Sequence, residues 1–174
     1  GLSLAEDSTY YFTVFATDFA GNESNAISSN GVIIDVTDPI PGIVRDVTPF
    51  YFILNDLSDQ SWINFNSSLI AYWYGFTDSL SGISNYEINV FDPENIPVIE
   101  WKTPDNDSTL FISGLSLDDD KTYKIAVKTT DLAGNKIIEL SNGIYVDLTP
   151  PTIESKSDKR ILLNDTTELE IVFS

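Results

Sequence analysis

The sequence predicts an all-β protein made of antiparallel β-sandwiches in tandem, and three observations support this prediction. Apolar and polar residues alternate along most segments, as they do in strands that bury one face. Clusters of Gly, Asn, Asp and Pro separate these segments, and helical periodicity is nowhere convincing. The third observation is an internal repeat, which sets the size of the folding unit.

The repeat begins at Gly1 and again at Gly114. Its identical positions are Gly1/Gly114, Leu2/Leu115, Ser3/Ser116, Leu4/Leu117, Thr9/Thr122, Tyr10/Tyr123, Val14/Val127, Thr17/Thr130, Asp18/Asp131, Ala20/Ala133, Gly21/Gly134 and Asn22/Asn135. After a turn of different length, both copies end in an Asp-x-Thr-x-Pro linker, at Asp35 and at Asp147. A period of about 110 residues fits a self-contained domain, because solenoid repeats are only about 20 to 50 residues long.

This repeat divides the chain into three parts. We expect residues 1–37 to be the C-terminal part of a preceding sandwich, residues 38–149 to be one complete repeat, and residues 150–174 to begin a following repeat. The two partial units are expected to be stubs or to lean on the complete one. Proline fixes its own φ and biases the residue before it to extended shapes, so the linkers should restrict rotation between units.

Seven strands are expected in the complete repeat, each bounded by turn residues: 42–47, 68–74, 84–91, 98–102, 109–113, 122–129 and 140–146. In the sixth, the predicted core face carries Tyr123, Ile125, Val127 and Thr129, and the predicted solvated face carries Lys124, Ala126 and Lys128. In the first copy the predicted core face carries Tyr10, Phe12, Val14 and Ala16. Its predicted solvated face carries Tyr11, Thr13 and Phe15. The uncharged run at residues 50–54 has the composition of an edge strand.

Spaced residues through the repeat are Leu69, Ala71, Trp73, Gly75, Phe76, Asp78, Ser81, Gly82, Ile83, Tyr86, Gly114, Leu115, Leu117, Thr122, Tyr123, Val127, Thr130, Asp131, Ala133, Gly134 and Asn135. This pattern resembles a fibronectin type III-like (immunoglobulin-like) repeat of large secreted and cell-surface proteins. The resemblance implies a seven-stranded sandwich in which Trp73 fills the centre of the second strand. It also implies a tyrosine corner at Tyr123 and at Tyr10. The run at 50–54 and an insertion that reaches Asn66 depart from the pattern.

The composition excludes several classes of function. Nine Lys plus Arg stand against 27 Asp plus Glu, and a net charge of −18 argues against nucleic-acid binding and against anionic membrane surfaces. Cys, Met and His are absent, which removes thiol and imidazole chemistry and leaves oxygen ligands for metals. No apolar run is long enough to insert into a membrane. An acidic, cysteine-free repeat protein suits an extracellular or cell-surface location.

Aspartates recur where loops are expected to meet linkers. In a fibronectin-like sandwich the turns after the second and sixth strands would bring Asp78 and Asp131 towards Asp35 and Asp38. Ca²⁺ takes six to eight oxygen ligands in flexible geometry, so these four are candidate ligands of an interdomain Ca²⁺. Their equivalents at the neighbouring junctions are Asp18 and Asp147. The alternative is that Asp18 and Asp131 only cap the following Ala-Gly-Asn turn.

Two other acidic runs, at residues 105–107 and 118–120, lack the Gly and Glu of a helix-loop-helix calcium site and are interpreted as solvated turns. Three aromatic residues, Tyr51, Trp62 and Trp101, are candidate contacts for glycans or other surface proteins. Their alternative role is to cover an open end of the sandwich. Four glycosylation acceptors occur, at Asn22, Asn66, Asn106 and Asn164.

The sequence therefore favours a structural or adhesive spacer of a long surface protein: a stalk, an adhesin or a surface-layer segment whose main partners are neighbouring repeats. One alternative is a glycan- or protein-binding module of a secreted enzyme, and another is a building block that assembles laterally into filaments or layers. A catalytic role is not expected, since no phosphate loop, nucleophile elbow or paired-His helix is present.

Overall fold

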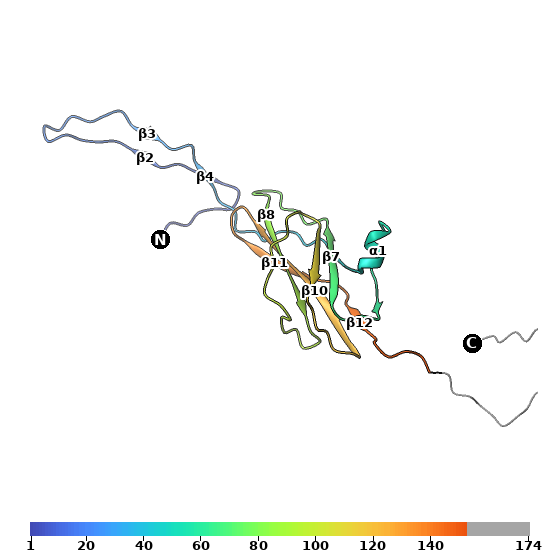
Figure 1. Cartoon of the computed structure of the whole chain (residues 1–174). Helices are drawn as coiled ribbons and strands as arrows, with labels where there is room; N and C mark the ends of the chain where they lie inside the picture. Colours follow the sequence, from blue (N-terminus) through green and yellow to red (C-terminus); the bar gives the residue numbers. More distant parts are fainter. Residues whose placement is uncertain (153–174) are drawn as a thin grey trace, which may run out of the picture.

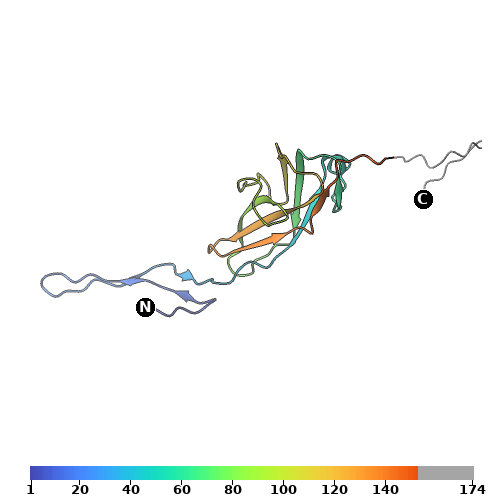
Figure 2. The ribbon, with the colours of Figure 1, turned by 90° about the horizontal axis from the view of Figure 1, so that it is seen from below.

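The computed structural model describes residues 1–152, and its regular structure there is nearly all β, as predicted. A two-sheet body follows an extended N-terminal hairpin that projects away from it (Figure 1). A view from below shows the same elongated arrangement (Figure 2). The hairpin strands are β1 (Thr9–Tyr10), β2 (Thr13–Val14), β3 (Ile27–Ser28) and β4 (Val32–Ile33). Within the described residues, no helix has the length and apolar character needed to span a membrane.

One sheet of the body contains β5 (Ile43–Val47), β7 (Ser68–Tyr74) and β9 (Thr109–Ser113), with β7 in the middle. Both pairings are antiparallel. The bounds of β7 and β9 agree with the predicted strands, and β5 begins one residue later than predicted. Alternation of apolar residues was therefore a sufficient signal for this sheet.

The second sheet is built around β10 (Lys121–Asp131), which pairs antiparallel with β8 (Ile83–Phe91). Two further antiparallel partners, β11 (Lys136–Leu140) and β12 (Ile144–Val146), pair with successive stretches of β10. A short strand, β6 (Trp62–Ile63), pairs with β12 in parallel. The expectation of a wholly antiparallel architecture is wrong here, because the insertion before β7 places β6 alongside β12.

The core lies between these two sheets. Trp73 of β7 is fully buried, as are Ile125, Val127 and Thr129 of β10, and Tyr123 is nearly so. All but Thr129 belong to one apolar cluster that joins both sheets. The predicted core face of β10 is confirmed.

The predicted solvated face of β10 is wrong in part. Ala126 is fully buried and the two flanking lysines are half-buried. Opposite Ala126 in β8 stands Asn89, whose Nδ2 donates to the carbonyl oxygen of Ile99 at 2.8 Å. This segment runs along the edge of β8, where the Val98 and Lys102 amides donate to the carbonyls of Val90 and Ile88, and its Trp101 ring lies against Lys128 of the outer face. Single-strand periodicity could not show this contact.

The segment does not form the regular strand predicted at residues 98–102. It makes only isolated bridges, between Ile88 and Lys102 and between Phe91 and Pro97. The strand predicted at 140–146 is also interrupted, between β11 and β12. The break has a polar cause: Ser141 Oγ donates to Asp46 Oδ1 at 2.8 Å, and the Gly143 amide donates to Asp46 Oδ2 at 3.1 Å.

The run interpreted as an edge strand is instead a single helical turn, α1 (Pro49–Ile53). Proline at the first helical position presets the backbone angle of the turn, and the Phe52 amide donates to the Thr48 carbonyl at 3.0 Å. The local proline thus overrides the β propensity of the aromatic residues after it.

The N-terminal hairpin leaves its predicted core face open. Phe12, Val14 and Ala16 are exposed and Tyr10 is half-buried, so the prediction that these residues form a core is wrong for the described chain. In the complete repeat the equivalent face is covered by strands that residues 1–37 do not contain. The start of the expected third repeat lies mostly outside the described residues.

Candidate metal centre

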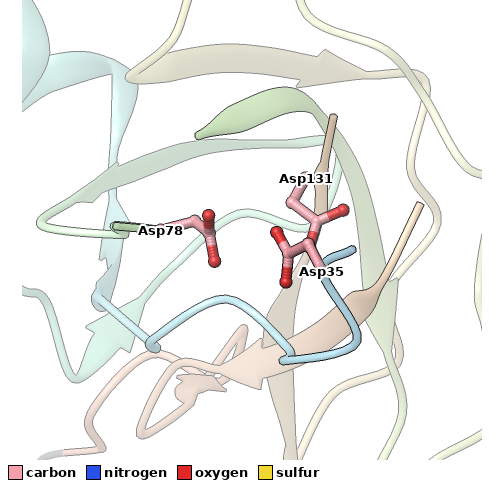
Figure 3. Close-up of side chains that lie close together, drawn as sticks. All are labelled: Asp35, Asp78 and Asp131. Atoms are coloured by element: carbon pink, nitrogen blue, oxygen red, sulfur yellow. The ribbon is translucent and has the colours of Figure 1, made fainter. Parts of the chain in front are cut away.

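Three aspartates meet where the linker joins the body. Asp35, Asp78 and Asp131 each offer a carboxylate oxygen, and these oxygens lie within 4.8 Å of one another. Asp35 belongs to the linker, Asp78 follows β7 and Asp131 ends β10, and Figure 3 shows their carboxylates turned towards one space. Asp131 is buried and the other two are half-buried. The predicted convergence of these three residues is thus present in the structure.

Asp78 is held by the turn that follows it. Its Oδ1 accepts hydrogen bonds from the backbone amides of Leu80, Ser81 and Gly82, at 3.1, 2.7 and 2.8 Å. These bonds, led by the one from Gly82, lower the pKa of the Asp78 carboxyl below its ordinary value. The side chain is therefore a fixed anion at neutral pH.

Asp131 holds the Ala-Gly-Asn turn. Its Oδ1 accepts from the amides of Gly134 and Asn135 at 2.6 and 2.8 Å, and its Oδ2 accepts from Asn135 Nδ2 at 2.8 Å. Asp18 makes two of these bonds in the hairpin, from the Asn22 amide at 2.9 Å and from Asn22 Nδ2 at 2.8 Å. The turn-capping interpretation therefore describes both residues. Each carboxylate oxygen accepts more than one partner, so capping leaves Asp131 able to contact a cation.

Asp35 contributes the oxygen that lacks a partner. Its Oδ1 accepts from the Thr37 amide at 3.1 Å, whereas its Oδ2 is buried and has no hydrogen-bond partner among the described residues. Neither of the two ion pairs among residues 1–152 involves this cluster. A buried carboxylate oxygen facing two other carboxylates calls for a cation or a proton.

The remaining predicted ligands lie elsewhere. Asp38 accepts from the Lys136 amide at 3.3 Å and is not one of the three clustered residues. Asp18 lies in the hairpin turn closed by the bridge between Thr17 and Glu23. The hairpin itself projects away from the body (Figure 1). Asp147 lies at the opposite end of the complete repeat, where it lines a surface hollow with Asp119 and Asp120.

Sequence reasoning missed a second set of acidic contacts at the linkers. Glu6 accepts from the Val36 amide at 2.8 Å and from Thr37 Oγ1 at 2.7 Å. Asp119 repeats this in the second copy, where it accepts from the Leu148 amide at 2.7 Å and Thr149 Oγ1 at 3.0 Å. We call each of these acids a linker clamp. The repeat itself could have indicated these contacts, because the two copies align Glu6 with Asp119. From the sequence, Asp119 is interpreted only as part of a solvated turn.

The predicted aromatic contacts do not form one surface. Tyr51 and Trp62 line the same shallow hollow, together with Phe50 and Phe65. Trp101 lies apart from it, with Lys128 Nζ 4.3 Å from the centre of its ring. The three candidate residues thus divide into a pair and a half-buried side chain on another face.

The glycosylation acceptors differ in how far their side chains are already engaged. Asn22 Nδ2 donates to Asp18 and Asn66 Nδ2 donates to the Leu117 carbonyl at 3.1 Å. Asn106 uses its Oδ1 to accept from the amides of Ser108 and Thr109. Asn164 lies outside the described residues.

No protein-family model matches this chain, and a search of curated proteins finds no match. The site must therefore be interpreted from its own geometry. The linker makes contacts on both sides. Its Val36 amide donates to Glu6 of the preceding hairpin, and its Asp35 side chain faces Asp78 and Asp131 of the complete repeat.

Proposed function

We propose that this chain is a structural spacer of a long extracellular or cell-surface protein, built from fibronectin type III-like repeats whose junctions are stiffened by Ca²⁺. The observation that carries the proposal is the meeting of a linker carboxylate, Asp35, with two carboxylates of the complete repeat. A cation bound by all three would tie the linker to the body and remove its rotational freedom. Neighbouring repeats of the same protein are the partners that such a junction serves.

Hydrogen bonds at the same junction support this mechanism. Asn135 Nδ2 donates to the Asp35 carbonyl oxygen at 3.3 Å, and the Lys136 amide donates to Asp38 Oδ1 at 3.3 Å. These two contacts bring the linker to the site without a metal but leave the Asp35 Oδ2 acceptor unused. Ca²⁺ suits the site better than Zn²⁺, since every side-chain donor is a carboxylate oxygen.

Two features support the fibronectin type III-like assignment of the fold. Trp73, the last residue but one of β7, is fully buried, and Tyr123 Oη accepts from the Asp118 amide at 2.9 Å, as a tyrosine corner would. Tyr10 repeats the contact with the Ala5 amide at 2.9 Å. Both contacts were expected from the resemblance of the sequence.

A Ca²⁺ titration tests the proposal. At constant ionic strength, saturating Ca²⁺ should raise the melting temperature by several degrees, because ten times the Kd adds about 1.4 kcal/mol to stability. Asp78→Asn should abolish this shift while keeping an oxygen acceptor for the turn.

Asp92→Asn is the matched control, since Asp92 also caps a turn, through the amides of Glu94 and Ile96, outside the cluster. Mg²⁺ controls for general screening of charge. An unchanged melting temperature at millimolar Ca²⁺ would refute the metal site, and an equal loss in both variants would refute the assignment of Asp78 as a ligand.

The hollow lined by Phe50, Tyr51, Trp62 and Phe65 supports a second candidate, a glycan- or protein-binding module. Trp62 is largely exposed there and lies 4.7 Å from the Tyr145 ring, between ring centres, so it offers a face for stacking. Binding of oligosaccharides that changes Trp62 fluorescence, and its loss in Trp62→Ala, would favour this function. If no oligosaccharide of a broad glycan panel binds, the spacer function would be favoured.

A further inference from the structure

The N-terminal hairpin reproduces the internal hydrogen bonds of the complete repeat. The Asp7 amide donates to the Ile34 carbonyl at 2.9 Å, as the Asp120 amide does to Val146. The Phe12 amide donates to Ser29 Oγ at 3.0 Å, and the equivalent bond from Ile125 to Ser141 Oγ measures 2.9 Å. The turn cap, the tyrosine corner and the linker clamp also occur in both copies. The hairpin therefore has the local geometry of a finished repeat.

What differs is whether the apolar face is covered. Val14 is 66% exposed and its equivalent Val127 is 0% exposed, and Phe12 is 74% exposed against 0% for Ile125. In the complete repeat the cover is the sheet β5-β7-β9, together with β8, which pairs with residues 124–131 of β10. The corresponding edge and face of the hairpin, around residues 11–17, have no such partner among the described residues.

We propose that the hairpin is a docking surface for the β5-to-β9 part of another repeat of this type. The occupant is defined by the strands that cover the equivalent apolar face of β10 in the same molecule. They are an apolar three-stranded sheet and one further strand, which would pair with the edge of the hairpin. The inference rests on the repeat organisation of the proposed function and is independent of Ca²⁺.

A buried aspartate supplies the polar part of the recognition. Asp46 of β5 is fully buried and accepts from Ser141 Oγ at 2.8 Å and from the Gly143 amide at 3.1 Å. The hairpin has the same donors, because Ser29 and Gly31 occupy the equivalent positions, and Gly31 shares the positive φ of Gly143. The docking partner therefore carries an acidic residue at the position of Asp46, within a strand of β5 type.

The test adds the missing strands to the full chain. A second copy of residues 38–113 is placed ahead of Gly1, so that Ser113 precedes Gly1 as it naturally precedes Gly114. The hairpin should then complete a second repeat. The calorimetric unfolding enthalpy should about double, since it scales with folded length, and binding of a hydrophobic dye should fall several-fold.

Two variants keep the outcome interpretable. Phe12→Ile gives the hairpin the residue found at position 125. This variant excludes the possibility that the new repeat fails to fold only because Phe12 does not fit the added core. Asp46→Ala in the added copy alone should lower the melting temperature of the new repeat and leave that of the original repeat unchanged. Equal melting with and without this substitution would refute the polar contact.

The proposal is overturned if the extended chain, with Phe12 or with Ile at that position, keeps the enthalpy and dye binding of the original. It is also overturned if the original chain is a dimer by light scattering at micromolar concentration with its hairpin amides protected, since the occupant would then be a second copy. Failure of the Ca²⁺ titration leaves both outcomes unaffected, because the clustered aspartates are not in the docking surface.

Discussion

At the scale of single residues, Asp46 is the most unusual side chain in the body. It is fully buried, with Ser141 and Gly143 as donors to its two oxygens. Burial, with a smaller contribution from the negative charge of Asp59, raises its pKa from 3.8 to about 7, and the bond from Ser141 opposes the rise. It joins the first strand of one sheet to the turn between β11 and β12.

This raised pKa predicts a pH dependence of stability. Because the folded state retains the Asp46 proton up to about pH 7, whereas the unfolded state loses it near 3.8, stability from this group falls as pH rises between those values. The slope is at most about 1.4 kcal/mol per pH unit. Urea unfolding at several pH values should show this slope, and Asp46→Asn should flatten it.

Three carboxyl groups with lowered pKa values affect stability at lower pH than Asp46 does. The pKa values of Asp18, Asp78 and Asp119 are lowered by hydrogen bonds, led by those from Asn22, Gly82 and Leu148 respectively. Their stabilising effect is present above their ordinary pKa and is lost only as pH falls through the lowered values. The difference between wild type and Asp46→Asn therefore isolates Asp46. A parallel pH profile in the two proteins would contradict the assignment.

At the scale of elements, β10 and the hairpin show how one pattern yields two environments. Both carry the same alternation, which forms β10 in the body and the shorter strands β1 and β2 in the hairpin, and both have the same tyrosine contact. Val127 is buried by the opposing sheet, whereas Val14 faces outward. Periodicity therefore indicates which face can be buried, and only the opposing sheet decides whether it is.

The two valines form a matched pair for mutation. Val127→Ala should destabilise the body by about 2 kcal/mol, because it opens a cavity in a close-packed core. Val14→Ala should change stability by less than about 0.5 kcal/mol, since an exposed side chain loses little contact. Urea denaturation measures both. Comparable losses would mean that the hairpin face is already covered in solution.

Local rules failed in two elements for identifiable reasons. The aromatic run after Thr48 forms α1 because Pro49 favours a first helical turn over an extended strand. The segment around Ile99 lies along the free edge of β8, where the Val98 and Lys102 amides donate to the carbonyls of Val90 and Ile88. The side chain of Asn89 binds the Ile99 carbonyl there, in place of a regular strand ladder. Each of these two structures depends on a single residue, whose effect is lost when hydrophobicity is averaged over a window of the sequence.

At the scale of the whole molecule, the proposed spacer function depends on how far the linker is held at the junction. The linker clamp fixes the direction in which each linker leaves its repeat, because Glu6 and Asp119 each bind a backbone amide and a threonine hydroxyl. Asp35, two residues before the clamped Thr37, faces Asp78 and Asp131 of the body. Strong net negative charge opposes this approach, which a bound cation would relieve.

The clamp is tested by hydrogen exchange at the linker. Glu6→Ala should speed exchange of the Val36 amide about 2- to 10-fold, because it removes that amide's only acceptor among the described residues. Asp119→Ala should do the same at Leu148. Glu94→Ala serves as the control, because Glu94 is an exposed acid with no hydrogen bond to either linker. Unchanged exchange at Val36 would show that the clamp does not hold the linker in solution.

The amino-acid sequence by itself determined the all-β class, the repeat, the inward face of β10 and the three aspartates that meet at the junction, since all depend on local periodicity or on duplicated residues. Tertiary structure alone decided that Asp38 stays outside the cluster, that Glu6 and Asp119 bind the linkers, and that one of two equivalent apolar faces is covered. The physical reason is the same in each case. Burial and hydrogen bonding depend on residues distant in the chain. A pattern within one segment does not indicate which distant residues will contact it.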